Sequence, residues 1–141
     1  MGLKLNKFSY DEIMVGSVFS FEKLIDEDLI KQFADFSGDR NPLHMDADYA
    51  SQTEFGGRIV HGALLGSLFS ALVGMLCPGE KSLYLSQSLN FKSPLKAGGT
   101  VIVEGEVISK SDVTKIVTLT TRIKDDAGKI LVDGEAKAKV L

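Results

Sequence analysis

The second half of the chain alternates between apolar and polar positions, which is typical of strands that bury one face. This alternation predicts four strands, at 83–91, 100–109, 113–124 and 129–140. The last strand is expected to point these apolar residues inward: Ile130, Val132, Ala136, Ala138 and Val140. Residues 125–128 have the composition of a hairpin turn, and a further short strand is expected over 17–22.

Two stretches show helical spacing instead of alternation. Residues 27–36 follow Asp26, a suitable N-cap, and precede Gly38, which can end a helix in the left-handed conformation. Residues 62–76 are apolar on every face of a helix, so this helix is expected to be buried on all sides. It is shorter than the ~20 residues that cross a bilayer, and no membrane association is expected.

The buried helix is the one element able to cover the apolar face of the strands. The sequence therefore predicts an α+β fold in which a curved antiparallel sheet wraps around one long helix. A chain of 141 residues is expected to form a single domain, 1–141.

Composition narrows the classes of function. Apolar residues make up 44% of the chain and charged residues 25%, which is ordinary for a globular protein. The net charge of −3 gives no reason to expect a nucleic-acid partner. The single cysteine excludes an internal disulfide and a multi-cysteine metal site. The first ten residues lack the apolar core of a signal peptide, so a cytoplasmic location is expected.

An acid and an imidazole, Asp39 and His44, stand five positions apart in an irregular segment. Pro42 disfavours helix at Asn41, so a structured turn is expected between them. Side chains of these two types, if they converge, can hold one water and exchange a proton with it. The spacing alone favours a plainer interpretation, in which Asp39 serves the turn and His44 is an ordinary half-buried polar residue. This spacing supplies too few ligands for zinc, so no metal site is expected.

Gly62 begins the apolar helix, where its backbone N–H has no intrahelical partner. An amide in that place can stabilise an oxygen that gains negative charge, but a glycine also suits close packing, and both interpretations stay open. His61 has no partner visible in the sequence and is interpreted as structural. Ser67 and Ser70 are not expected to be nucleophiles, because serines in buried helices usually bond to their own backbone.

Three segments of the chain closely resemble the MaoC-like (R)-specific enoyl-CoA hydratase family of hotdog-fold proteins, at 33–46, 59–64 and 84–95. The first carries a D-x-N-P-x-H signature from Asp39 to His44, and the second carries V-H-G at 60–62. The resemblance covers roughly residues 19–107, and this paired signature is far more specific than the spacing of an acid and a histidine.

The resemblance implies a hotdog fold and reversible syn addition of water to a trans-2-enoyl thioester, which gives the (R)-3-hydroxyacyl product. Asp39 and His44 fall on the family's catalytic pair, and Gly62 falls on the glycine whose N–H holds the thioester carbonyl. Ser70 falls on a supporting serine, and Asn41 is expected to fix the turn. No metal or redox cofactor is implied, because the CoA or acyl-carrier-protein thioester is part of the substrate.

Other activities of the fold stay open. A (3R)-hydroxyacyl-[acyl-carrier-protein] dehydratase runs the same chemistry in reverse, and motifs cannot separate the two. A thioesterase or a non-catalytic acyl-binding subunit would share the fold, but the intact signature weighs against both. Hotdog relatives join sheets whose edges are otherwise unpaired, so a homodimer is expected. The basic residues considered for contact with a carrier's phosphates are Arg40, Arg58, Lys92 and Lys96.

Overall fold

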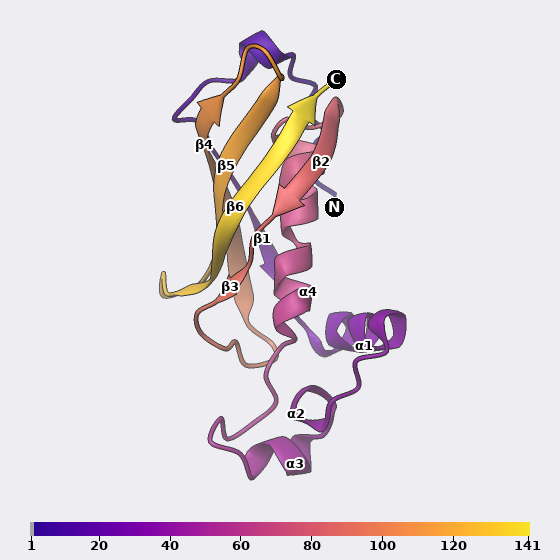
Figure 1. The fold of residues 1–141 in the computed structure, drawn as a ribbon. Helices are drawn as coiled ribbons and strands as arrows, with labels where there is room; N and C mark the ends of the chain where they lie inside the picture. The colour runs from indigo at the N-terminus through magenta and orange to yellow at the C-terminus, as the bar shows by residue number, and fades with distance from the viewer. Residues whose placement is uncertain (1) are drawn as a thin grey trace.

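The structure, a computed structural model, describes residues 2–141 and contains one six-stranded antiparallel sheet with a long helix against it (Figure 1). The strands are β1 (Val18–Leu24), β2 (Ser82–Gln87), β3 (Asn90–Phe91), β4 (Thr100–Lys110), β5 (Ile116–Asp125) and β6 (Ile130–Val140). Their order in the sheet is β1-β4-β5-β6-β2, and β3 also pairs with β6. The shorter helical elements are η1 (Tyr10–Glu12), α1 (Glu27–Ser37), α2 (Pro42–Met45) and α3 (Ala47–Ser51). This is the predicted α+β hotdog arrangement.

The long helix consists of three consecutive elements, α4 (Gly62–Ser67), α5 (Phe69–Ala71) and the π-helical η2 (Leu72–Leu76). The predicted bounds of 62–76 are confirmed. The prediction that this helix is buried on all sides is wrong for the single chain, since Ala63, Ser67 and Ser70 are exposed. The reason is that one sheet covers only one side of the helix, and small residues occupy the other side. No helix among residues 2–141 is long and apolar enough to cross a bilayer.

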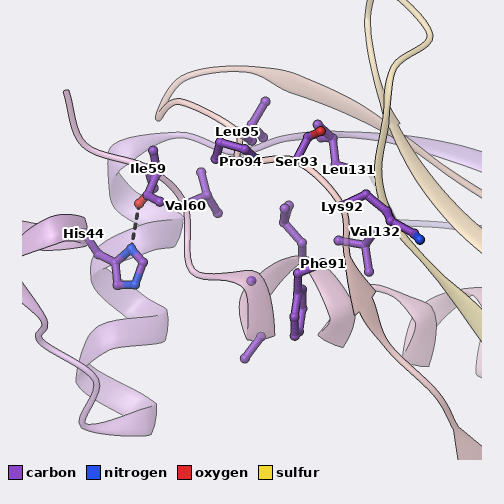
Figure 2. Close-up of a pocket in the computed structure, with 13 residues that line it drawn as sticks. His44, Ile59, Val60, Phe91, Lys92, Ser93, Pro94, Leu95, Leu131 and Val132 are labelled. Atoms are coloured by element: carbon purple, nitrogen blue, oxygen red, sulfur yellow. Dashed lines mark hydrogen bonds between the residues drawn. The ribbon is translucent and has the colours of Figure 1, made fainter. Parts of the chain in front are cut away.

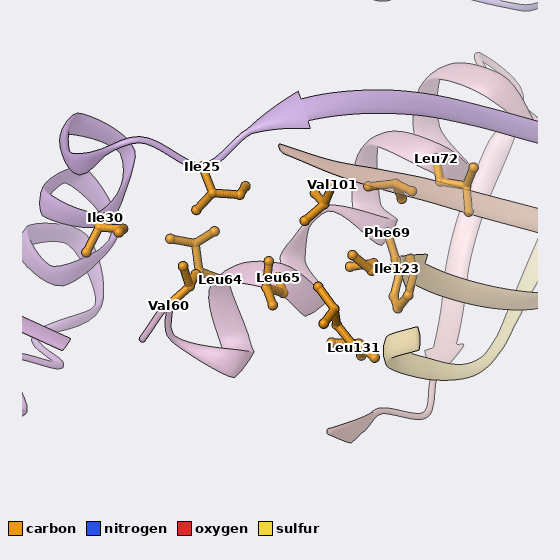
Figure 3. Packing of buried hydrophobic residues seen from close by; sticks show 12 residues of the cluster. Ile25, Ile30, Val60, Leu64, Leu65, Phe69, Leu72, Val101, Ile123 and Leu131 are labelled. Atoms are coloured by element: carbon orange, nitrogen blue, oxygen red, sulfur yellow. The ribbon is translucent and has the colours of Figure 1, made fainter. Parts of the chain in front are cut away.

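The core lies between this helix and the sheet, and it extends to α1 (Figure 3). Ile25 follows β1 and Ile30 belongs to α1, and both join Val60 and Leu64 in the same cluster. Each of these four side chains is at most 3% exposed. Burying such a side chain stabilises the fold by about 1.5–3 kcal/mol. Apolar packing therefore fixes the place where α1 and the start of α4 meet.

The predicted strand over 83–91 is divided into β2 and β3. Between them, the Ser88 N–H donates to the Glu135 carbonyl at 2.9 Å, and the Ser88 hydroxyl accepts from the Glu135 N–H at 2.8 Å. The chain crosses β6 so closely here that a Cβ at Gly134 would lie 1.8 Å from the Ser88 carbonyl oxygen. The alternation of apolar and polar residues does not reveal such a crossing, so the sequence predicts a single long strand.

The inward positions of β6 differ from the prediction at one end. The pairing of β5 with β6 shifts register between Ile123 and Lys124. Leu131 is consequently 1% exposed and Ile130 is 39% exposed, so the predicted inward position of Ile130 is wrong. The other four predicted inward positions are buried. β5 begins at Ile116, three positions after the predicted start, because residue 113 lies in a turn.

We expect Gly134→Ala to destabilise the fold, because the added methyl group would have to displace the Ser88 backbone. Overpacking of this kind typically costs about 1–3 kcal/mol, which chemical denaturation measures. Gly57→Ala is the matched control, since nothing lies within 4 Å of the Cβ that it would add. Equal unfolding free energies for the two variants would contradict the close crossing.

Candidate active site

The turn between α1 and α2 places Asp39 and His44. α1 ends at Gly38, whose φ of 82° is the left-handed conformation that glycine adopts at little cost. α2 then begins after Asn41, whose side-chain oxygen accepts a hydrogen bond from the Leu43 N–H at 3.0 Å. The turn expected from the sequence thus ends in a one-turn helix that carries His44, and Asn41 is the cap of that helix.

The Asp39 carboxylate is exposed, and one of its oxygens serves the turn. Oδ1 accepts the Asn41 N–H at 3.1 Å, which is the local role that the spacing alone favoured. Within residues 2–141, the structure gives the second carboxylate oxygen no hydrogen bond. The turn role and a chemical role are therefore compatible, because they use different oxygens of the same side chain.

His44 borders a cavity of about 400 Å³ between the start of α4 and the segment after β3 (Figure 2). Its Nδ1 lies 2.8 Å from the Ile59 carbonyl oxygen, and because a carbonyl only accepts, Nδ1 carries the proton. In the neutral ring, Nε2 then holds a lone pair, to which no hydrogen bond comes from the part of the chain that the structure describes. An accepting ring nitrogen at the edge of a cavity can bind and deprotonate a water.

The cavity has a mostly apolar lining, which suits an apolar chain that ends in a polar group. Its remaining wall residues are Ile59, Val60, Gly62, Ala63, Leu65, Phe91, Lys92, Ser93, Pro94, Leu95, Leu131 and Val132. Phe91 lies so close to Gly62 that a Cβ there would be 2.9 Å from its ring. Close packing is thus one reason for this glycine. Its backbone N–H also lacks a backbone partner within residues 2–141.

His61 is 1% exposed and has contacts that the sequence did not indicate. Its Nε2 lies 3.0 Å from the Asp39 carbonyl oxygen. Its ring stacks on that of His44, with 4.1 Å between the centroids and 29° between the planes. Burial is the main cause that lowers the pKa of His61 from its ordinary value of 6.5. The residue therefore links both members of the Asp39–His44 pair.

Asp39, His44 and His61 each offer a possible metal-ligand atom, and these three atoms lie within 4.8 Å of one another. A zinc ion would need ring lone pairs that point at one centre. One nitrogen of each ring already faces a carbonyl oxygen, which leaves His44 Nε2 and His61 Nδ1 as the possible ligand atoms. His61 Nδ1 is fully buried, so the exposed Asp39 carboxylate and His44 Nε2 are the two groups available to hold a water.

Arg58 fastens α2 to the start of α1. Its Nε donates to the His44 carbonyl oxygen, and its guanidinium forms an ion pair with Glu27. Arg40 likewise pairs with Asp35. Both arginines considered for phosphate contact are thus engaged within the chain. The sequence does not indicate these two contacts of Arg58, because its partners lie 14 and 31 positions away.

The structure brings Asp39, His44 and Gly62 to the N-terminal end of α4, and it does not bring Ser70 there. Ser70 is exposed on α5 and is absent from the cavity wall. Ser67, one turn earlier, donates from its hydroxyl to the Leu64 carbonyl at 2.6 Å, as expected for a serine in a helix.

The chain is similar to known proteins over most of its length. The family model of the MaoC like domain matches residues 14–128. The (R)-specific enoyl-CoA hydratase of Aeromonas caviae is 43% identical over 132 residues, which is 94% of this chain and 98% of that protein. A mitochondrial 3-hydroxyacyl-[acyl-carrier-protein] dehydratase of Arabidopsis thaliana is 33% identical over 129 residues, 89% of this chain and 76% of that protein. The solved structure of unliganded R-hydratase PhaJ1 from Pseudomonas aeruginosa matches with a TM-score of 0.92 and 41% identity, over 99% of this chain and 88% of that one.

The chain therefore belongs to the MaoC-like domain family.

We expect Asn41→Ala to lower both stability and turnover, because it removes the cap that starts α2 and frees His44 to move. A lost cap costs about 1 kcal/mol, and the misplaced imidazole should lower kcat by about tenfold or more. Asn41→Ser keeps a capping oxygen and is the matched control. Denaturation and steady-state kinetics measure the two effects, and indistinguishable alanine and serine variants would refute the capping role.

Proposed function

We propose that this enzyme is a hydro-lyase that adds water reversibly to trans-2-enoyl-CoA and forms (R)-3-hydroxyacyl-CoA. The observation that carries the proposal is the closeness of an Asp39 carboxylate oxygen and a His44 ring nitrogen, which lie within 4.8 Å of each other. Two hydrogen bonds of about 2.8–3.0 Å from one water, at its angle of about 105°, span about 4.4–4.7 Å, so a single water can bridge atoms at this separation.

The chemistry follows from which atoms accept hydrogen bonds. The second Asp39 oxygen and His44 Nε2 are both acceptors, and a water has two hydrogens. The water therefore donates one hydrogen to each and keeps an oxygen lone pair for the β-carbon of the substrate. As that C–O bond forms, Asp39 takes a proton from the water, with His44 orienting it and sharing the acid–base work, and the electron pair of the C=C bond moves onto the thioester. The proton then passes to the α-carbon on the same face, which completes a syn addition and restores the carboxylate.

We assign stabilisation of the negative charge on the thioester oxygen to the Gly62 N–H. This amide begins the helical segment 62–76, at the positive end of its dipole. A donor of this kind typically contributes ~10²–10³ in rate. The apolar cavity beside it would receive the substrate chain. The mechanism uses no metal or redox cofactor, because the carrier is part of the substrate. A cytoplasmic location is part of the proposal.

A (3R)-hydroxyacyl-[acyl-carrier-protein] dehydratase is the second candidate, and the identity of 33% to the Arabidopsis thaliana dehydratase favours it. The two activities share one site and differ in the carrier. Comparing kcat/KM for crotonyl-CoA with that for the crotonyl thioester of a carrier protein separates them. Release of free thiol would instead indicate a thioesterase, and tight acyl binding without water addition would indicate a non-catalytic subunit.

We expect Asp39→Asn and His44→Gln each to lower kcat for crotonyl-CoA by ~10²–10⁴, because each removes an acceptor that holds the water. The loss of absorbance of the conjugated thioester measures turnover, and chiral chromatography should identify the (R) product. Both variants should keep the unfolding free energy of the wild type to within about 1 kcal/mol. Gln52→Ala, an exposed change on a neighbouring element, is the control. Near-normal turnover in Asp39→Asn would remove the carboxylate from the mechanism.

We also propose that the enzyme is a homodimer joined at β2, because this strand ends the sheet and leaves one side of its backbone unpaired. Large apolar side chains are exposed along β2 and β3, namely Leu83, Leu85, Leu89 and Phe91. A second copy of the chain would cover them and satisfy the strand edge.

Sedimentation analysis should give twice the mass of the 141-residue chain. Leu83→Lys places a charge on the β2 edge and should shift the protein towards monomer. Val18→Lys makes the same change at an exposed position of β1, the opposite edge strand, and should leave the dimer intact. The reverse result would move the interface to β1.

A further inference from the structure

His61 contacts both proposed catalytic residues, although the mechanism above gives it no chemical step. We propose that His61 is a positioning residue, which aligns the Asp39 turn and the His44 ring for the addition of water. This inference rests on the proposed function. It assigns to His61 a role that the sequence did not indicate.

The ring of His61 is held on three sides. Nε2 lies 3.0 Å from the Asp39 carbonyl oxygen, and the ring stacks on His44 at 4.1 Å between centroids. The ring of Phe33 lies 4.8 Å away with 56° between the planes. Because the residue is 1% exposed, its ring has no open space in which to rotate. The start of α4 therefore determines the positions of Asp39 and His44 through the His61 ring.

The hydrogen-bond partners determine the tautomer of His61. The Asp39 carbonyl only accepts, so Nε2 carries the proton. Nδ1 then holds a buried lone pair, and no group within residues 2–141 donates to it. A second proton at Nδ1 would create a buried N–H without an acceptor, which is costly. The ring is thus constrained to be neutral and to donate towards the Asp39 turn.

Stacking supplies an alignment that the hydrogen bond of His44 cannot supply alone. The bond from Nδ1 to the Ile59 carbonyl restrains one atom of the His44 ring, which leaves the ring free to tilt about that contact. The His61 ring stacks on the His44 ring, with 29° between the two planes, and this contact prevents the tilt. Nε2 of His44 is then held in one direction, and the hydrogen bond to the Asp39 backbone fixes the turn that carries the carboxylate.

The charged and titratable groups around His61 favour its neutral form. Burial lowers its pKa most; His44 and Arg58 act in the same direction, and Asp39 opposes them. A pKa below the ordinary 6.5 means that the unfolded chain binds this proton more readily than the folded one. The contribution of neutral His61 to the stability of the folded chain is complete above pH 6.5. It is lost as the pH falls through the lower pKa of His61 in the folded state. Acidification should therefore loosen both aligned groups.

Two variants separate the parts of this role. His61→Phe keeps a ring for stacking and loses the donor, whereas His61→Gln keeps an amide N–H near the Nε2 position and loses the ring. We expect His61→Phe to lower kcat for crotonyl-CoA by at least about tenfold with KM within about threefold, and His61→Gln to recover part of the loss. Val117→Ala, at a fully buried position of β5 in a separate cluster around Cys77, should lower stability and leave kcat of the folded enzyme unchanged.

The chain contains two histidines, so ¹⁵N spectra of the imidazoles report on His44 and His61 alone. At about pH 7.5, the wild type should show His61 protonated at Nε2 and His44 at Nδ1. In His61→Gln, which removes the stacked ring, the His44 signals should change to those of a ring that exchanges between tautomers.

The proposal is overturned if wild-type His61 is protonated at Nδ1 or carries both protons at about pH 7.5. It is also overturned if folded His61→Phe retains the kcat of the wild type, or if folded His61→Gln retains its His44 spectrum. A wild type without hydratase activity would refute the proposed function instead, and the spectra would still decide whether His61 orders the His44 ring.

Discussion

The segment 58–61 holds the proposed catalytic turn through four hydrogen bonds. Arg58 donates to the His44 carbonyl, and the Ile59 N–H donates to the Leu43 carbonyl. The Ile59 carbonyl accepts from His44 Nδ1, and His61 bonds to the Asp39 carbonyl. Gly62 follows this segment directly, so one stretch of backbone sets the distance between the acid–base pair and the start of the helix. Since a misplacement of about 1 Å can cost about 10²-fold in rate, the proposed chemistry would depend on these bonds.

Several residues of the site combine a structural contact with a chemical group that stays available. Asp39 uses one oxygen to hold the Asn41 N–H and keeps the other. Gly62 admits the ring of Phe91 and presents its N–H at the helix start. His44 anchors itself through one ring nitrogen and keeps the second as an acceptor. The plainer interpretations of Asp39 and Gly62 describe the structural contacts of these residues, and the chemical roles proposed for them use groups that those contacts leave available.

Much of the fold could be predicted because apolar spacing reflects burial directly, as the bounds of the long helix show. The inward side of β6 near Leu131 could not, since a register shift relative to β5 decides it and leaves no trace in local alternation. The Asp39 and His44 pair could be inferred from the family signature. Arg58 and His61 act through contacts that exist only after distant segments meet, so neither spacing nor composition marks them.

Two glycines of the long helix allow the edge of the sheet at β3 to lie close to it. Phe91 occupies the place of a Cβ at Gly62, and Leu89 occupies that at Gly66, with separations of 2.9 and 2.8 Å. Enlarging Gly62 would displace the ring of Phe91, which lines the cavity, and enlarging Gly66 would displace the side chain of Leu89. Cavity width and the shape of the edge proposed for self-association are therefore mechanically coupled. A larger residue at Gly62 would thus alter the cavity wall and the edge proposed for self-association together.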